Sequence, residues 1–311
     1  MARPSQVHQN KTLERISVAF RPIGMVHQEL SPTISVKHES DIFYVYSKDN
    51  MRVPETRWAD SAQANRAVTW NVSTSTYTLV RHGLEELVTD RLVANADSAI
   101  KPLVDATENI TDKIMLRKEI DLLSIINTAS NFANTTSLST TQHWNVDTTL
   151  SNPIIFIDSA TTAIRRNASK IANTVVLPDA TFKAVKEHQS IVDRVKHTSM
   201  QSVGPDILAT LFNVDKVLIS GAVQNTGEQD LADALTDVMT DNAFVAFIER
   251  SPGLKKPSAV YTFVKEGSTT PIKMETYRDD PHEGDVVRGS SFFEHKFIAT
   301  ECAYLIVNTA S

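Results

Sequence analysis

The chain has 311 residues, a formal net charge of −6 and a single cysteine, with 41% hydrophobic and 22% charged residues. This composition is ordinary for a folded protein, and it lacks the basic excess of chains that bind nucleic acid through its phosphates. The lone Cys302 excludes an internal disulfide and a thiolate metal cluster. Apolar runs such as Pro153–Ile157 are too short to span a bilayer and no signal peptide opens the chain, so we expect cytosolic synthesis and no membrane partner.

Residues 1–40 predict an extended N-terminal arm. They contain Pro4, Pro22 and Pro32, carry more basic than acidic residues up to Lys37, and show no sustained hydrophobic period. A segment of this kind is typically ordered only within an assembly, and a plain flexible terminus is the alternative interpretation.

Residues 41–82 predict a long, polar β-hairpin. Asp41–Ser47 and Ala67–Val80 form its two strands, and in the second strand Val68, Trp70 and Val72 alternate with polar residues, as in a half-buried strand. The connecting segment is mostly charged or small, with Met51, Val53 and Trp58 as its large apolar residues. Because a lone two-stranded ribbon is marginal in water, we expect another subunit to hold this hairpin.

Helical patterns dominate the middle of the chain. Apolar residues from Leu84 to Val93 recur at helical spacing, and Thr107–Asn131 contains neither Gly nor Pro, which predicts a helix of roughly 25 residues after Pro102. A Thr-, Ser- and Asn-rich loop anchored by Trp144 follows it. Further predicted helices run from Pro153 through Arg166 and cover 179–188, 205–212 and the acidic run Glu228 to Asp241.

Predicted strands are concentrated in the second half. They cover 173–177, 216–220, 243–248, 258–264, 272–277 and 285–288, with two more segments within 292–307. Helices in the middle and strands near the end indicate an α+β fold.

No catalytic, cofactor or metal site emerges from the side-chain pattern. His188 and His197 flank a charged stretch that is best interpreted as a solvated helix end, and the acids from Asp230 to Asp241 lack the ligand spacing of a calcium loop. Gly289–Ser291 lacks the second glycine of a nucleophile elbow, and Cys302 reads as a small buried hydrophobe. The hairpin cations Lys48, Arg52, Arg57 and Arg66 alternate with acids, which indicates a solvated surface or, alternatively, ion pairing between subunits.

The order of these segments resembles that of the major capsid proteins of tailed bacteriophages, which have the Hong Kong ninety-seven-type shell fold. The resemblance covers about Asp41 to the C-terminus. The segments that carry it are YTLVRHGLEELVTDR (77–91), LLSIINTASNFA (122–133), LSNPIIFI (150–157), NTVVLPDATFKAVKEH (173–188), IVDRVK (191–196) and LATLFNVDKVLISGAVQN (208–225). These are packing and turn motifs, specific by order and spacing and not by catalytic chemistry.

The resemblance implies a division of the chain into an N-terminal arm (1–40), an extended hairpin (41–82), a peripheral domain with a long spine helix (83–203), an axial domain (204–290) and a return to the peripheral domain (291–311). It also implies a non-enzymatic subunit that forms hexamers and pentamers in an icosahedral shell around double-stranded DNA, located in the virion after assembly in the host bacterial cytoplasm. Scaffold, portal and decoration proteins are further implied partners. Some relatives carry a cleaved scaffolding segment before the arm or cross-link covalently; we expect no scaffolding segment here, and no cross-linking Lys–Asn pair maps onto the sequence.

Two alternatives stay open from the sequence. A bacterial encapsulin-type compartment has the same fold and would enclose a cargo enzyme in place of DNA. A soluble hydrolase with a site near His188–His197 would be a monomer or dimer, and particle size would separate it from a shell subunit.

Overall fold

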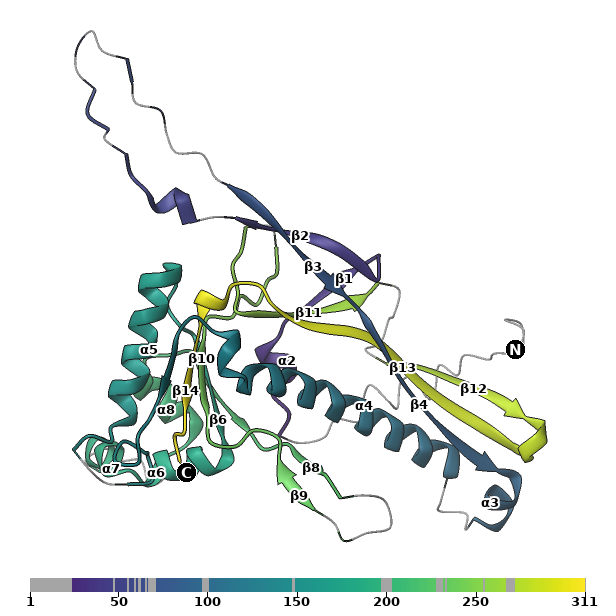
Figure 1. The fold of residues 1–311 in the computed structure, drawn as a ribbon. Helices are drawn as coiled ribbons and strands as arrows, with labels where there is room; N and C mark the ends of the chain where they lie inside the picture. Colours follow the sequence, from purple (N-terminus) through teal and green to yellow (C-terminus); the bar gives the residue numbers. More distant parts are fainter. Residues whose placement is uncertain are drawn as a thin grey trace.

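The computed structural model describes residues 24–310 apart from 47, 55, 59, 61–62, 65, 67–70, 97–100, 147–148, 197–202, 228–231, 233, 254 and 267–271. Figure 1 shows two bodies joined side by side and a ribbon that projects from them. We call them the mixed-sheet body, the spine body and the ribbon.

The mixed-sheet body is a five-stranded sheet flanked by helices. Its strand order is β5-β14-β10-β6-β7, in which β5–β14 and β6–β7 pair in parallel and the other neighbours are antiparallel. All side chains of β6 and β10 are buried, which explains their continuous apolar sequences. The elements are β5 (Thr135–Ser137), α5 (Pro153–Ala168), β6 (Thr174–Pro178), α6 (Asp179–Glu187), α7 (Gln189–Val195), α8 (Pro205–Phe212), β7 (Lys216–Ser220), β10 (Ala243–Ala246) and β14 (Ala303–Val307).

The spine body consists of a 26-residue helix lying along a long, twisted sheet (Figure 1). Pro102 occupies the first turn of this helix, α4, where its missing N–H costs no hydrogen bond. The sheet order is β1-β11-β13-β12, and β4 pairs with β13 along its other side. The elements are β1 (Thr33–Val36), β4 (Val80–Thr89), α3 (Asp90–Asn95), α4 (Pro102–Asn127), β11 (Val260–Lys265), β12 (Lys273–Asp279) and β13 (Gly284–Phe297).

The helix packs close to the sheet because a glycine lies beneath it. A Cβ atom on Gly289 of β13 would come within 2.4 Å of Ile110 Cγ2 and 3.1 Å of Ile114 Cδ1. Farther along α4, Leu122, Leu123 and Ile126 are fully buried in a core shared with strands of both bodies. The helix therefore joins the two bodies through its C-terminal half.

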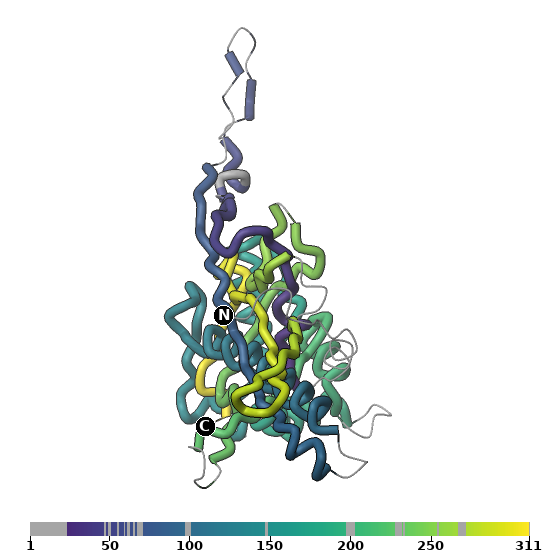
Figure 2. The backbone as a smooth tube through the Cα atoms, turned by 90° about the vertical axis from the view of Figure 1, so that its right-hand side faces the viewer, coloured from purple at the N-terminus to yellow at the C-terminus, as the bar shows by residue number. Residues whose placement is uncertain are grey.

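The ribbon and several short elements complete the fold. β2 (Ser40–Tyr46) and β3 (Val72–Thr78) pair antiparallel, and the tube in Figure 2 shows the ribbon extending away from both bodies. The short elements are α2 (His27–Leu30), η2 (Lys48–Met51), η3 (Ala129–Asn131), β8 (Val223–Asn225), β9 (Leu235–Asp237), η4 (Asp280–His282) and η5 (Thr300–Cys302).

Many predicted elements are confirmed, as is the α+β class. The long helix, the helices after Pro153, Pro178 and Pro205, and the strand at Lys216–Ser220 lie where the patterns placed them, with end shifts of a few residues. Trp144, the predicted loop anchor, is 1% exposed.

Two helix predictions are wrong. The segment after Leu84 continues as strand β4 to Thr89, and only Asp90–Asn95 is helical, because ten backbone pairings with β13 outweigh local helix preference. Within the acidic run, Leu235–Asp237 forms strand β9 with β8, while 228–231 and 233 lie outside the described residues.

Strand pairing also groups the chain differently from the predicted boundaries at 203 and 290. Strands β11, β12 and the first half of β13 fall within the predicted axial range, yet β13 pairs with β11, with β12 and with β4, most of which lies in the peripheral range. Conversely, β14 of the predicted return segment pairs with β10 in the mixed-sheet body. Alternation and burial indicate a strand but do not identify its partner. The axial and peripheral positions themselves stay predictions.

Candidate assembly surface

The strand register gives the ribbon two distinct faces. Side chains directly opposite each other across an antiparallel pair lie on the same face. Ile42, Tyr44 and Tyr46 therefore share one face with Thr76, Thr74 and Val72, which we call the outer face. Phe43 and Tyr77 lie on the opposite, inner face.

The inner face is seated on the spine body. Phe263 of β11 stacks on Tyr77 with ring centroids 4.6 Å apart and on Phe43 at 5.9 Å. Tyr77 and Leu79 are 5% and 7% exposed, and both belong to a small apolar cluster with Phe263. The expectation that another subunit holds the hairpin therefore does not apply at its base, where aromatic residues of β11 and β13 provide a seat within the same chain.

The outer face and the distal part of the ribbon expose apolar side chains. On the outer face Ile42, Tyr44 and Val72 are 51%, 57% and 50% exposed. Farther out, Met51, Val53 and Trp58 are 50%, 81% and 70% exposed. Val68 and Trp70 of the predicted strand lie outside the described residues. A row of large apolar side chains left in water is typical of a surface that another molecule covers.

One predicted inter-subunit cation is used within the chain. Lys48 Nζ lies 2.9 Å from Glu301 Oε1, so the ribbon is also tied to the short helix η5 before β14. Neither a solvated surface nor pairing between subunits, the two alternatives for these cations, anticipated this contact within one chain. Arg52 and Arg57 also have interaction partners within the chain, while for Arg66 the choice between a solvated surface and pairing between subunits stays a prediction.

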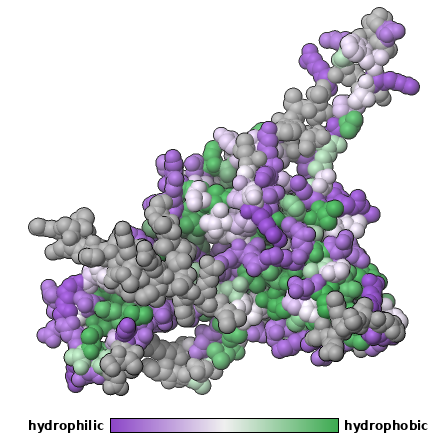
Figure 3. Space-filling model, turned by 180° about the vertical axis from the view of Figure 1, so that it is seen from behind, coloured by the Kyte–Doolittle hydropathy of each residue, from purple (hydrophilic) through white to green (hydrophobic). Residues whose placement is uncertain are grey.

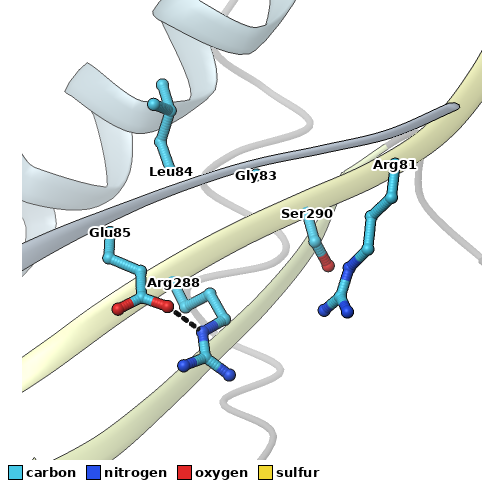
Figure 4. A pocket seen from close by; sticks show the side chains of 6 residues that line it. All are labelled: Arg81, Gly83, Leu84, Glu85, Arg288 and Ser290. Carbon is cyan, nitrogen blue, oxygen red and sulfur yellow. Dashed lines mark hydrogen bonds and ion pairs between the residues drawn. The ribbon is translucent and has the colours of Figure 1, made fainter.

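A shallow groove of about 460 Å³ lies on the spine-body sheet, between side chains of β4 and β13 (Figure 4). It follows from the register: the smallest cross-strand pair, Gly83 and Ser290, lies between the pairs Arg81–Phe292 and Glu85–Arg288. Arg81 lies 5.5 Å from the ring centre of Phe292, and Arg288 is ion-paired with Glu85. The Glu85 carboxylate in the groove is therefore already held by Arg288, and its lining contains no His, Cys, Asp or Lys that could complete a catalytic site.

The alternative hydrolase site is not assembled. His188 is 4% exposed and its Nδ1 accepts from the Ser190 N–H at the start of α7. Its Nε2 lies 3.2 Å from Ser151 Oγ, but Ser151 is 1% exposed and donates to the His143 carbonyl oxygen at 2.6 Å. These groups therefore cap and connect buried elements. His197 lies outside the described residues.

The remaining sequence candidates have structural roles. Cys302 is fully buried, and burial followed by the charge of Glu301 raises the pKa of its thiol to about 11, which confirms its interpretation as a small hydrophobe. Gly289–Ser291 lies in the middle of strand β13 and not at a strand-to-helix turn. Among the described residues, no three His, Cys, Asp or Glu side chains are grouped as metal ligands. Within the same residues no helix is long and apolar enough to cross a membrane.

Comparisons with known proteins identify chains that are similar to this one in sequence and in structure. No family model matches the chain. It is 24% identical over 301 residues to the major capsid protein of Burkholderia phage BcepMu, covering 94% of each chain, and 27% identical over 183 residues to that of Pseudomonas phage JBD67, covering 58% and 57%.

Solved structures share the fold over nearly the whole chain. A phage-related protein from Bordetella bronchiseptica matches with a TM-score of 0.75 and 19% identity, covering 97% of this chain and 98% of that one. The capsid of cyanophage P-SCSP1u matches with a TM-score of 0.63 and 11% identity, covering 94% and 90%. An encapsulin complex from Synechococcus elongatus matches at 0.58 and 10%, covering 97% and 96%. The chain is therefore a homologue of phage major capsid proteins and has the Hong Kong ninety-seven-type capsid fold.

Proposed function

We propose that this chain is a major capsid protein whose copies assemble into hexamers and pentamers and close an icosahedral shell around double-stranded phage DNA. The observation that carries the proposal is the outer face of the ribbon, with three apolar side chains at least half exposed on one face of a two-stranded element. The inner face is already occupied by the chain's own aromatic seat. The outer face is therefore the one offered to a second copy.

Repetition makes such a contact sufficient for assembly. Full burial of one large apolar side chain contributes about 1.5–3 kcal/mol, part of which offsets the cost of ordering the ribbon and the subunit. A closed shell repeats the contact in every subunit, so modest interfaces add up to a stable particle. The apolar tip residues Val53 and Trp58 extend the contact beyond the outer face.

The proposal assigns the enclosed DNA no sequence-specific site. A net charge of −6 gives shell and DNA the same sign, which supports enclosure without adhesion to the inner wall. The proposed location is the virion capsid, after assembly in the cytoplasm of the bacterial host. Scaffold, portal and decoration proteins are proposed as further partners by analogy with shells of this fold.

Particle size tests the proposal. The purified full chain is examined by sedimentation and negative-stain microscopy beside the double variant Ile42→Ser/Tyr44→Ser, which removes two apolar side chains from the outer face. We expect rings or shells from the unaltered chain and subunits of 34.4 kDa from the variant. The matched control is Ile171→Ser, which removes a 60% exposed apolar side chain from the mixed-sheet body and should leave particles intact.

Two outcomes contradict the proposal. An unaltered chain that stays monomeric at high concentration is not a self-assembling shell subunit, and particles unaffected by the outer-face variant would place the main contact elsewhere. Particles isolated from their natural source that hold an enzyme in place of DNA would favour the encapsulin alternative.

A further inference from the structure

The segment just before the ribbon crosses both bodies of the molecule. Residues 24–36, which we call the strap, begin at the mixed-sheet body, pass over α4 and end as strand β1 on the spine-body sheet (Figure 1). Its residues Val26 and Leu30 are 5% and 0% exposed and lie in the core that the two bodies share. The strap is thus part of the joint between them.

The first attachment of the strap is to the mixed-sheet body. The carbonyl oxygen of Gly24 accepts from the Gly221 N–H at 3.2 Å, just after β7. Gly24 has φ +89, and a Cβ there would lie 3.3 Å from the Gly221 carbonyl carbon, so both conformation and contact favour glycine. Glu29 adds an ion pair with Lys216 of β7 at 2.7 Å.

The second attachment is a buried carboxylate on the spine helix. Glu119 of α4 is fully buried and accepts from the backbone N–H groups of Val26 at 3.0 Å and His27 at 2.9 Å. Its Oε2 also lies 2.9 Å from His27 Nδ1. A buried carboxylate is costly unless donors surround it, and here three donors from the strap converge on one side chain.

The third attachment is to the spine-body sheet. Ser31 Oγ lies 2.6 Å from Thr262 Oγ1 of β11, and the Thr262 N–H donates to the Pro32 carbonyl oxygen at 3.0 Å. Beyond them, β1 pairs in parallel with β11 from Thr33 to Val36. The strap therefore binds one body at its start and the other at its end, with Glu119 between them.

We propose that the strap is a clamp that locks the mixed-sheet body against the spine body, and that Glu119 is the positioning residue that holds the clamp closed. The lock is a property of the single chain and goes beyond the proposed shell function.

Hydrogen exchange measured by mass spectrometry tests the clamp in the full chain, with all variants compared in the same oligomeric form. Glu119→Gln keeps the shape of the side chain but removes its charge. It also replaces one of the two acceptor oxygens with an NH2 group, which cannot accept a hydrogen bond from the N–H groups of the strap. We expect exchange to speed up about tenfold or more at Val26 and His27. The clamp further predicts faster exchange at Gly221 and Thr262, whose N–H groups bond to strap carbonyls on opposite bodies, while β10 and β14 stay protected.

Glu108→Gln is the matched control, because it makes the same chemical change on the same helix away from the strap. It should leave all these rates unchanged. Faster exchange in Glu119→Gln confined to Val26 and His27 would reduce Glu119 to a local cap and overturn the clamp. An equal rise in β10 and β14 would indicate general destabilisation and would overturn it as well.

A second variant keeps the test decisive if Glu119→Gln does not fold. Gly24→Ala strains the first attachment and leaves Glu119 intact. Release at this end should speed exchange at Gly221 and also along the strap to Ser31. A change restricted to Gly221 would show that the two ends act independently, which contradicts the clamp.

Discussion

The two faces of the ribbon are built from the same two strands, but one is buried against the chain and the other is exposed. The inner face places Phe43 and Tyr77 on Phe263 of the same chain, whereas the outer face leaves Ile42 and Tyr44 more than half exposed. Figure 3 shows the ribbon from behind, projecting beyond a surface of mixed hydropathy. The difference teaches that one element can be anchored by its own chain and still expose apolar side chains on its other face, so the stability of the subunit and its proposed assembly depend on different faces.

Removing the seat should have the largest effect on stability. Phe263 is 4% exposed and contacts both inner-face rings, so Phe263→Ala should lower the free energy of unfolding by about 3–5 kcal/mol. Urea denaturation of dissociated subunits measures this change. A loss below about 1 kcal/mol would mean that the inner face is as loosely held as the outer one.

Acid should destabilise the folded subunit through its buried interior and not through the outer face. Burial, followed by the nearby charges of His27 and Lys118, lowers the pKa of His295, on β13 next to β11, from 6.5 to about 3. Below pH 6.5 the His295 imidazole binds a proton in the unfolded chain but stays neutral in the folded chain. The free energy of unfolding should therefore fall by about 3 kcal/mol between pH 6.5 and pH 4. Denaturation at several pH values measures the slope.

The variant His295→Asn isolates this contribution. It should flatten the acid slope relative to the unaltered chain, because the group that titrates differently in the two states is gone. An identical slope in both proteins would assign the acid sensitivity to other residues.

The outer face should contribute almost nothing to the stability of one subunit. Ile42→Ser/Tyr44→Ser should change the free energy of unfolding of dissociated subunits by no more than about 0.5 kcal/mol per site. Urea denaturation below the assembly concentration measures it. A loss comparable to that of Phe263→Ala would remove the distinction between the two faces.

The ion pair at the ribbon root should have the smallest effect. Both side chains are partly exposed, at 50% for Lys48 and 34% for Glu301, so Lys48→Ala should cost about 0.5 kcal/mol or less. The cost should shrink further in high salt. Comparing denaturation at low and high ionic strength checks this, and a salt-independent loss would point to packing of the Lys48 stem.

The sequence predicted elements well where local chemistry decides them. Pro102, Pro153 and Pro205 each occupy a first helical turn, and the apolar segment at Lys216–Ser220 forms a strand with the predicted bounds. It also predicted the paired strands of the hairpin.

The rest depended on partners distant in the sequence. Leu84 and Leu87 have helical spacing, but their backbone pairs with residues about 200 positions later in β13. The aromatic seat under Phe43 and the strap bonds to Glu119 likewise join residues far apart in the sequence. The local sequence pattern does not encode such contacts. The burial of the inner face was therefore not predicted, whereas the need of the ribbon for a partner on its outer face was.

The absence of a side chain at Gly289 fixes the position of the spine helix along the sheet. Ile110 and Ile114 fit above a residue without a side chain. A shift of the helix along the strand would drive them against Val287 or Ser291, the neighbours of Gly289 on the same face of β13, and repulsion resists this shift. The glycine therefore fixes the register of the helix on the strand, and the absence of one side chain sets the distance between helix and sheet.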